Sequence, residues 1–243
     1  MTESFALLAI AMMLVAFLYS TVGHGGASGY IAVMTLFGLG VETIRPTALA
    51  LNILVALIGS LQWWRAGHFS WALFWPFAVL AVPCAFLGGW LHIPADFLKI
   101  LLGLVLLYSA ARLLFRKSDP GSTHPPRLSV ALASGAGIGF LSGLTGTGGG
   151  IFLTPLLIFM KWAKAREAAA TSSVFILVNS IAGLGGQLGS GSSLPDLTWM
   201  LTAAVAAGGY AGSRLGSRHT PIRGISMLLA IVLLIASGKL LLG

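Results

Sequence analysis

Two glycine-rich stretches decide the fold: GHGGASGYIAV at residues 23–33 and GLTGTGGGIFLTPLL at residues 143–157. Each leads into a short apolar run, 30–38 in the first case and 151–160 in the second. These runs are about half the 20 residues that a helix needs to cross a hydrocarbon core of roughly 30 Å. The glycine clusters begin 123 residues apart, at Gly23 and Gly146. We therefore expect a helix break and a half-length helix at matching places in the two halves of the chain.

The rest of the chain consists of longer apolar runs with short connections. They cover residues 4–21, 46–64, 71–91, 97–115, 128–144, 168–187, 198–215 and 222–242. Hydrophobic residues make up 57% of the 243 residues and charged residues 8%, and the mean hydropathy is +0.94. Because soluble chains carry about a quarter charged residues, this composition excludes a soluble globular domain. It predicts an all-α, polytopic membrane protein.

The two halves have the pattern of one duplicated unit. Residues of the same type recur at offsets that drift from 124 to 128: Gly59 and Gly183, Trp71 and Trp199, Pro94 and Pro221. This self-similarity predicts a first membrane repeat at 1–115, a polar linker RKSDPGSTHPPR at 116–127 and a second membrane repeat at 128–243. Each repeat would hold a glycine-broken hairpin helix and three crossing helices, and the two repeats would form one transport domain.

Lysine and arginine positions distinguish two ways of threading this unit through a membrane. Four plain crossings per half, starting inside, would leave six of the 14 cationic residues on the cytoplasmic side. If each glycine cluster is the tip of a hairpin that returns to its starting side, the second half is inverted and eleven lie inside: Arg65, Arg112, Arg116, Lys117, Arg127, Lys161, Lys164, Arg166, Arg214, Arg218 and Arg223. The positive-inside rule favours the second arrangement. It predicts inverted-topology repeats, a cytoplasmic linker and both termini outside.

Two facing helix breaks are typical of a binding site in secondary transporters. Half-helices that begin at Tyr30 and Ile151 would present free N–H groups and positive dipole ends, which attract anions. None of the six Asp and Glu residues lies inside a predicted crossing, which argues against a cation pathway. Backbone amides and nearby hydroxyls would then hold a small anion; the hydroxyls are those of Ser28, Thr145, Thr147, Ser172 and Ser173.

Each of these features also has a purely structural interpretation. The glycines could serve only the close approach of helices, as small-xxx-small motifs do. His24 could couple transport to protons or could simply pack and hydrogen-bond locally, and its counterpart in the second half is Thr147. Asn52 and Asn179, each in an apolar run, could line the cavity or could bridge helices.

In these stretches the chain resembles the TauE/SafE family of sulfite exporters. The resemblance covers nearly the whole chain and includes RPTALALNILVALIGSLQWWRAGHFSW at 45–71 and AREAAATSSVFILVNSIAGL at 165–184. It implies a multi-pass protein of the bacterial inner membrane that moves sulfite, sulfonates or other organosulfur oxyanions, commonly outward. It also implies substrate binding at the matching positions, which are Gly23, Gly25, Gly26, Gly146, Gly148, Gly149, Asn52, Thr171 and Ser172. In one respect the copies differ, because only the second half-helix contains a proline, Pro155.

Two other functions compete with a carrier that works by alternating access. A passive anion channel would use the same amides and dipoles. Gly26-Ala27-Ser28-Gly29 resembles the nucleophile motif of rhomboid intramembrane proteases, but the second glycine cluster has no matching serine and no histidine lies within a second span to act as base. We therefore expect a transporter and no enzyme, and neither a metal nor another cofactor. Its expected partners are a small anion and the lipid bilayer, not nucleic acid, and a homo-oligomer is compatible with the sequence.

Overall fold

The structure, a computed structural model, describes residues 2–91, 93–114, 122–218, 234, 237–239 and 241–242. This part of the chain forms nine helices and contains no strand, so the predicted all-α class is confirmed. The helices are α1 Thr2–Ser20, α2 Ala27–Leu36, α3 Val41–Arg65, α4 Trp71–Trp90, α5 Ala95–Leu114, α6 Leu128–Thr145, α7 Gly150–Phe159, α8 Ala165–Gly189 and α9 Asp196–Arg218. The predicted linker 116–127 lies partly, and the last apolar run 222–242 mostly, outside the described residues.

Both predicted breaks are present. Helix α1 ends at Ser20 and α6 ends at Thr145, and the half-helices α2 and α7 that follow are ten residues each. The predicted start of the first half-helix at Tyr30 is wrong, because α2 begins at Ala27. Gly26 takes a left-handed φ of 113°, which ends the break, and the small residues after it already have helical geometry.

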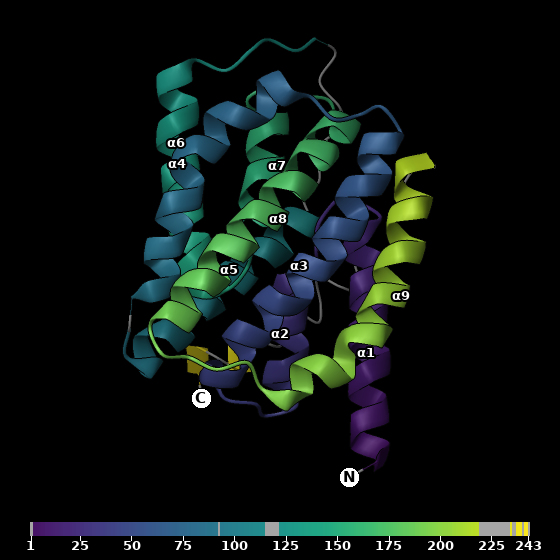
Figure 1. Cartoon of the computed structure of the whole chain (residues 1–243), viewed down its shortest axis with the longest axis vertical. Coiled ribbons are helices and arrows are strands. Elements are labelled where there is room, and N and C mark those ends of the chain that lie inside the picture. The colour runs from purple at the N-terminus through teal and green to yellow at the C-terminus, as the bar shows by residue number, and fades with distance from the viewer. Residues whose placement is uncertain are drawn as a thin grey trace.

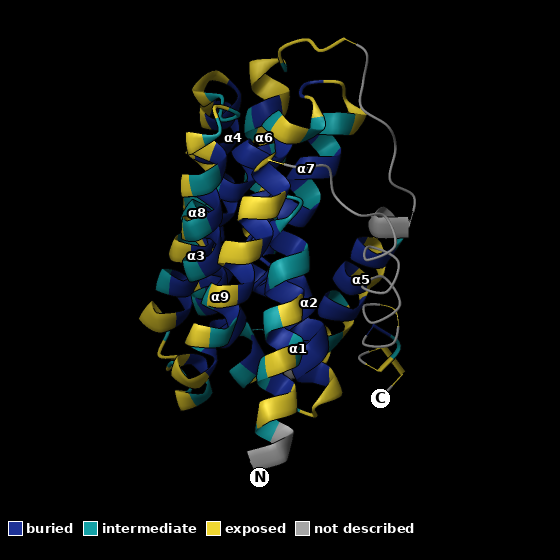
Figure 2. Ribbon diagram, turned by 90° about the vertical axis from the view of Figure 1, so that its right-hand side faces the viewer, coloured by how far each residue is buried: buried dark blue, intermediate teal, exposed yellow. Residues whose placement is uncertain are grey.

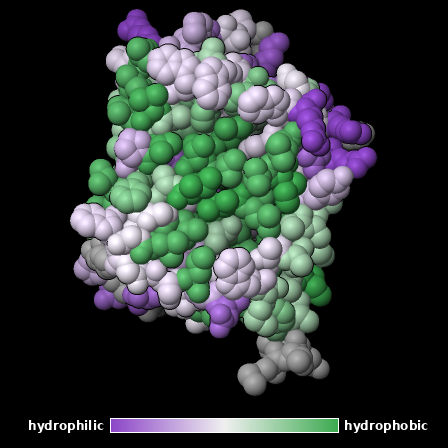
Figure 3. Space-filling model, viewed as in Figure 1, coloured by the Kyte–Doolittle hydropathy of each residue, from purple (hydrophilic) through white to green (hydrophobic). Residues whose placement is uncertain are grey.

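Four of the described helices are both long and apolar enough to cross a membrane: α3, α4, α6 and α8. The segment Phe5–Ser20 of α1 and the half-helices α2 and α7 are apolar but shorter. On the face seen in Figure 3, hydrophobic side chains form a broad band across the middle of the molecule, with hydrophilic side chains toward its two ends. This distribution is that of a multi-pass membrane protein, whose middle faces hydrocarbon.

Each half-helix turns back along the helix that precedes it. In the first hairpin, the Ser28 hydroxyl of α2 donates to the Tyr19 hydroxyl of α1 at 2.9 Å. In the second hairpin, the amide of His124, just before α6, donates to the carbonyl of Lys161, just after α7, at 3.0 Å. The chain therefore folds back on itself at each break.

Two glycine stripes bring pairs of helices into backbone contact. Gly135, Gly139 and Gly143 of α6 lie against the carbonyls of Phe77, Ala81 and Ala85 of α4. Gly208, Gly212 and Gly216 of α9 lie against the carbonyls of Met13 and Phe17 in α1 and of Thr21 just after it. Glycines four residues apart share one helix face. Any Cβ at these six positions would overlap backbone atoms of the neighbouring helix. The stripes therefore fix α6 on α4 and α9 on α1.

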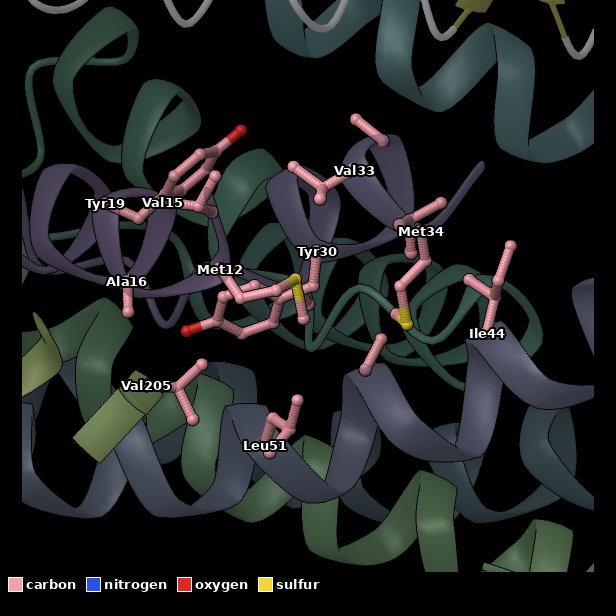
Figure 4. Close-up of a cluster of buried hydrophobic side chains, with 14 of the residues drawn as sticks. Met12, Val15, Ala16, Tyr19, Tyr30, Val33, Met34, Ile44, Leu51 and Val205 are labelled. Carbon is pink, nitrogen blue, oxygen red and sulfur yellow. The ribbon is translucent and has the colours of Figure 1, made fainter. Parts of the chain in front are cut away.

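The stripes divide the molecule into two bundles with separate cores. One core draws its buried side chains from α1, α2, α3, α5 and α9, and the other from α4, α6, α7, α8 and the segment just before α8. Figure 1 shows α4 and α6 on one side, α1 and α9 on the other, and α3 and α8 between them. Figure 2 shows buried residues on the inward faces of both bundles. In the first core, side chains of α1 and α2 such as Met12 and Tyr30 lie close to Leu51 of α3 and Val205 of α9 (Figure 4).

The bundles meet where α3 crosses α8. A Cβ atom added to Gly183 of α8 would lie 3.6 Å from Leu49 of α3. A Cβ atom added to Gly59 of α3 would lie 3.8 Å from the Ser173 hydroxyl of α8. Because residue numbers rise along α3 as they fall along α8, the two helices are antiparallel. The crossing is next to both glycine breaks.

Candidate functional site

In the first break the backbone carbonyl groups accept hydrogen bonds, but some of the backbone amide groups donate none. The carbonyl of Gly23 accepts the Ser173 hydroxyl at 2.9 Å, and the carbonyl of Gly25 accepts the Tyr30 hydroxyl at 3.0 Å. The carbonyl of Gly26 accepts the amide of Tyr30 at 2.9 Å. The amide N–H groups of Gly25 and Gly26 are buried, yet they donate to no acceptor among the described residues. A buried N–H without a partner costs about 1–3 kcal/mol, so this break has the chemistry to bind a negative group.

The second break repeats this feature. Gly146, Gly148 and Gly149 have left-handed φ values of 78°, 73° and 82°. The amide groups of Thr147, Gly148 and Gly149 are buried and, within the described residues, donate to no acceptor. Gly149 directly precedes the first turn of α7, where the helix dipole is positive. Each break therefore presents unpaired amides at the N-terminus of a half-helix.

The side chain of Asn52 lies between the two breaks. A Cβ on Gly25 would overlap the Asn52 amide oxygen, and a Cβ on Gly148 would overlap the Asn52 amide nitrogen. Asn52 Nδ2 donates to the Ser180 hydroxyl of α8 at 2.9 Å, while its Oδ1 is buried without a partner among the described residues. The sequence left open whether Asn52 lines the site or bridges helices, and in the structure it contacts both breaks and bridges α3 to α8.

The N-terminal parts of α3 and α8 contact the breaks in a reciprocal way. Gly23 in the first break lies against the backbone and Cβ of Ala169 in α8. Gly146 in the second break lies against Arg45 in α3: a Cβ atom added to Gly146 would lie 3.2–3.6 Å from the backbone and Cβ of Arg45. Arg45 also reaches the carbonyl of Gly143 with Nη2 at 3.4 Å. Each break is thus seated on the third helix of the other half.

Several hydroxyls predicted to bind the anion are engaged locally. Thr145 donates to the carbonyl of Leu141 at 2.7 Å, which leaves Thr147 as the donor in the 2.9 Å contact between their hydroxyls. Ser28 donates to Tyr19, and Ser172 accepts the hydroxyl of Thr154 at 2.8 Å. These bonds stabilise the ends of the hairpins.

The other predicted residues differ in what they offer. His24 Nδ1 lies 3.1 Å from the carbonyl of Val22, and its ring meets the edge of Tyr19 with the centroids 6.3 Å apart. The Thr171 hydroxyl and the Asn179 amide oxygen are buried without partners among the described residues, although Asn179 Nδ2 donates to Phe175 in its own helix. Asn52 is therefore the predicted side chain that the structure brings to both breaks.

Two residues at the breaks were missed by the sequence analysis. Arg45 was not among the residues predicted to bind the anion, but it lies beside Gly146. Ile176 contacts the positions of Gly25, Gly148 and Gly150 and so lies with Asn52 between the breaks. Arg45 could have been found from its position close after the glycine-broken hairpin. Nothing in the local pattern distinguishes Ile176 from the other apolar residues of its run.

Paired broken helices inside a bundle of membrane-spanning helices are typical of membrane transporters. The chain belongs to the family described as sulfite exporter TauE/SafE, which it matches over residues 8–240. It is 45% identical over 240 residues to the probable membrane transporter protein y4hK of Sinorhizobium fredii, covering 96% of this chain and 97% of that protein. It is 26% identical to the probable membrane transporter protein YdhB of Bacillus subtilis, covering 88% of this chain and 89% of the relative. No solved structure matches the chain.

Proposed function

We propose that this protein carries small oxyanions, such as sulfite, sulfonates and related organosulfur anions, by alternating access, and holds the anion between the two glycine breaks. The observation that supports this most is the set of buried, unpaired amides at Gly25, Gly26, Thr147, Gly148 and Gly149. An oxyanion accepts several N–H bonds at once, and none of the six Asp and Glu residues lies within either glycine break. The family's description as sulfite exporters suggests the substrate class.

We further propose that residues 1–115 and 128–243 are inverted repeats. Helices α3 and α8 are both 25 residues, α2 and α7 are both ten, and members of the first pair cross in opposite directions. The contact of Gly23 with Ala169 mirrors that of Gly146 with Arg45. An approximate two-fold axis in the membrane plane accounts for all of these relations.

The arginines support the threading in which both termini lie outside the inner membrane. Arg65 lines one cavity together with Arg166, Arg214 and Arg218. Four plain crossings per half would place Arg65 on the opposite side from the other three, whereas inverted repeats place all four inside. Single cysteines at the two termini, in a background without Cys84, should react with an impermeant maleimide in intact cells. Labelling only after permeabilisation would contradict this orientation.

Transport is tested in proteoliposomes with radiolabelled sulfite, thiosulfate, taurine and sulfoacetate, with and without a pH gradient. We expect saturable uptake of at least one of these anions and counter-transport on preloading. Flux that stays linear with concentration and shows no counter-transport would favour a channel. Absence of protein-dependent flux for all four anions would reject the proposed substrate class.

Two variants connect the flux to the breaks. Asn52→Asp places a carboxylate between the two sets of amides and should abolish anion flux, while Asn52→Gln keeps the amide and should retain part of it. Ser28→Ala removes only a hydroxyl that donates to Tyr19, so flux should persist. Loss of flux in Ser28→Ala, together with cleavage of a membrane peptide by the unmodified chain, would favour the protease alternative.

A further inference from the structure

A cavity of about 580 Å³ lies at one end of the bundle, where α3 and α9 end and α8 begins. Four guanidinium groups surround it, and no carboxylate is among its lining residues; those used below are Gln62, Arg65, Arg166, Tyr210, Arg214 and Arg218. Its volume is in the range of sites that bind small molecules. The transport mechanism proposed above does not use these arginines.

In the described part of the chain, none of the four arginines of this cavity forms an ion pair. The one ion pair there joins Lys99 to Asp96 in α5, which do not line the cavity. Four like charges around one cavity repel one another and raise the local concentration of anions. Guanidinium groups also match oxyanions geometrically, because their fork donates two parallel N–H bonds.

Tyr210 holds part of the cavity in place. Its hydroxyl accepts Nη1 of Arg214 at 2.9 Å, and its carbonyl accepts Nε2 of Gln62 at 3.0 Å. These bonds orient one guanidinium and join the end of α3 to α9. The arginines thus belong to a wall that the fold builds from three helices rather than to separate flexible loops.

The cavity is also close to the first glycine break. Arg166 precedes Ala169 by three residues in α8, which is about 4.5 Å along the helix axis, and Ala169 contacts Gly23. On the other side, Gly216 of α9 packs against the carbonyl of Thr21, where α1 ends. An anion leaving this cavity toward the interior would meet the first break within one helical turn.

We propose that this arginine cavity is an oxyanion-binding site at the entrance to the first break, which captures the anion before it reaches the central site. This inference rests on the proposed function for its role in transport, but the binding itself does not. The ligand is a tetrahedral or pyramidal oxyanion carried either by the free substrate or by the phosphate of an anionic lipid headgroup.

The test compares Arg166→Gln/Arg214→Gln with Arg166→Lys/Arg214→Lys and with Lys164→Gln, which removes a charge at the same end without lining the cavity. Sulfite binding is measured on purified protein in phosphatidylcholine nanodiscs, and flux in matching proteoliposomes. The double Gln variant should bind sulfite about tenfold more weakly and show a KM raised by a similar factor at unchanged Vmax. Increasing salt should weaken binding to the unmodified protein more than binding to this variant, which keeps only Arg65 and Arg218. Lys164→Gln should behave like the unmodified protein, and the double Lys variant should lie between.

Nanodiscs with added phosphatidylglycerol separate the two sources of the oxyanion. If the lipid supplies it, the unmodified protein retains phosphatidylglycerol in native mass spectrometry, the double Gln variant does not, and added lipid displaces sulfite. Unchanged sulfite binding, salt dependence and lipid retention in a variant with normal thermal stability would overturn the proposal. If the double Gln variant loses sulfite binding but the unmodified protein transports none of the anions, the binding cavity is supported and the proposed function is rejected. If the unmodified protein transports normally and the double Gln variant binds and transports like it, the proposed function is supported and the binding cavity is rejected.

Discussion

Replacing Gly25 by alanine tests whether the first break and α3 form one site. Gly25 is not among the residues with left-handed φ, so alanine fits its backbone without strain. The added methyl group would, however, overlap the amide oxygen of Asn52, lie 2.7 Å from its Cγ and lie 3.2 Å from Cγ2 of Ile176. Overpacking of this kind costs about 1–3 kcal/mol, and Asn52 can yield only by breaking its bond to Ser180.

A double-mutant cycle isolates this collision. In an Asn52→Ala background the obstructing amide is absent, so Gly25→Ala should cost little, and the interaction energy should be about 1–3 kcal/mol. The free energy of unfolding is measured in detergent micelles, and flux is measured in proteoliposomes. Gly25→Ala should lose both stability and flux, and the double variant should regain stability without flux, since it lacks Asn52.

The matched control is Gly137→Ala in α6. Nothing lies within 4 Å of a Cβ at this position, so the change should be neutral or stabilise the helix by up to about 1 kcal/mol. If the costs of Gly25→Ala and Asn52→Ala simply add, or if Gly25→Ala is as mild as the control, the described contact between the break and α3 is wrong.

Three further changes test other contacts. Gly139→Leu would drive a side chain into the backbone of α4 and should destabilise the protein by about 3 kcal/mol, whereas Gly137→Leu on the open face should still give monodisperse protein in size-exclusion chromatography. Ser173→Ala removes the hydroxyl whose single proton is shared between the carbonyls of Gly23 and Ala169, each at 2.9 Å, and should lower the free energy of unfolding by about 1–3 kcal/mol; an unchanged unfolding curve would contradict these contacts. Arg45→Gln removes the positive charge beside the second break and should raise the KM for anions about tenfold, with Arg45→Lys closer to the unmodified protein in the same flux assay.

Much of the fold could be predicted because membrane helices are encoded locally. A run of apolar residues fixes the position of a crossing helix, and the described helix ends agree with those runs within a few residues. The error at the start of α2 has a local cause: Ala27, Ser28 and Gly29 look like part of the glycine break, but Gly26 alone supplies its final left-handed turn. The sequence did not predict which helices pack together, because the glycines of the two stripes were not distinguished from the other small residues of these helices.

The site was predicted less completely than the fold. The glycines of both breaks follow from their conformational freedom, and they are where the sequence places them. The contacts of Asn52 with Ser180 and of Arg45 with Gly143 join residues 128 and 98 positions apart, and no periodicity within one helix determines them. The same holds for the arginine cavity, whose members come from three helices and carry only a topology signal when each is considered alone.

The two glycine stripes determine which parts of this protein can move as rigid bodies. Because α9 is fastened backbone to backbone onto α1, and α6 onto α4, each half of the polypeptide lends its fourth helix to the other bundle. Cutting the chain between residues 115 and 122 would therefore leave two fragments that stay interlocked without a covalent bond. The mechanical division of the molecule runs between α3 and α8, through the amide of Asn52, and not through the linker that separates the repeats in sequence.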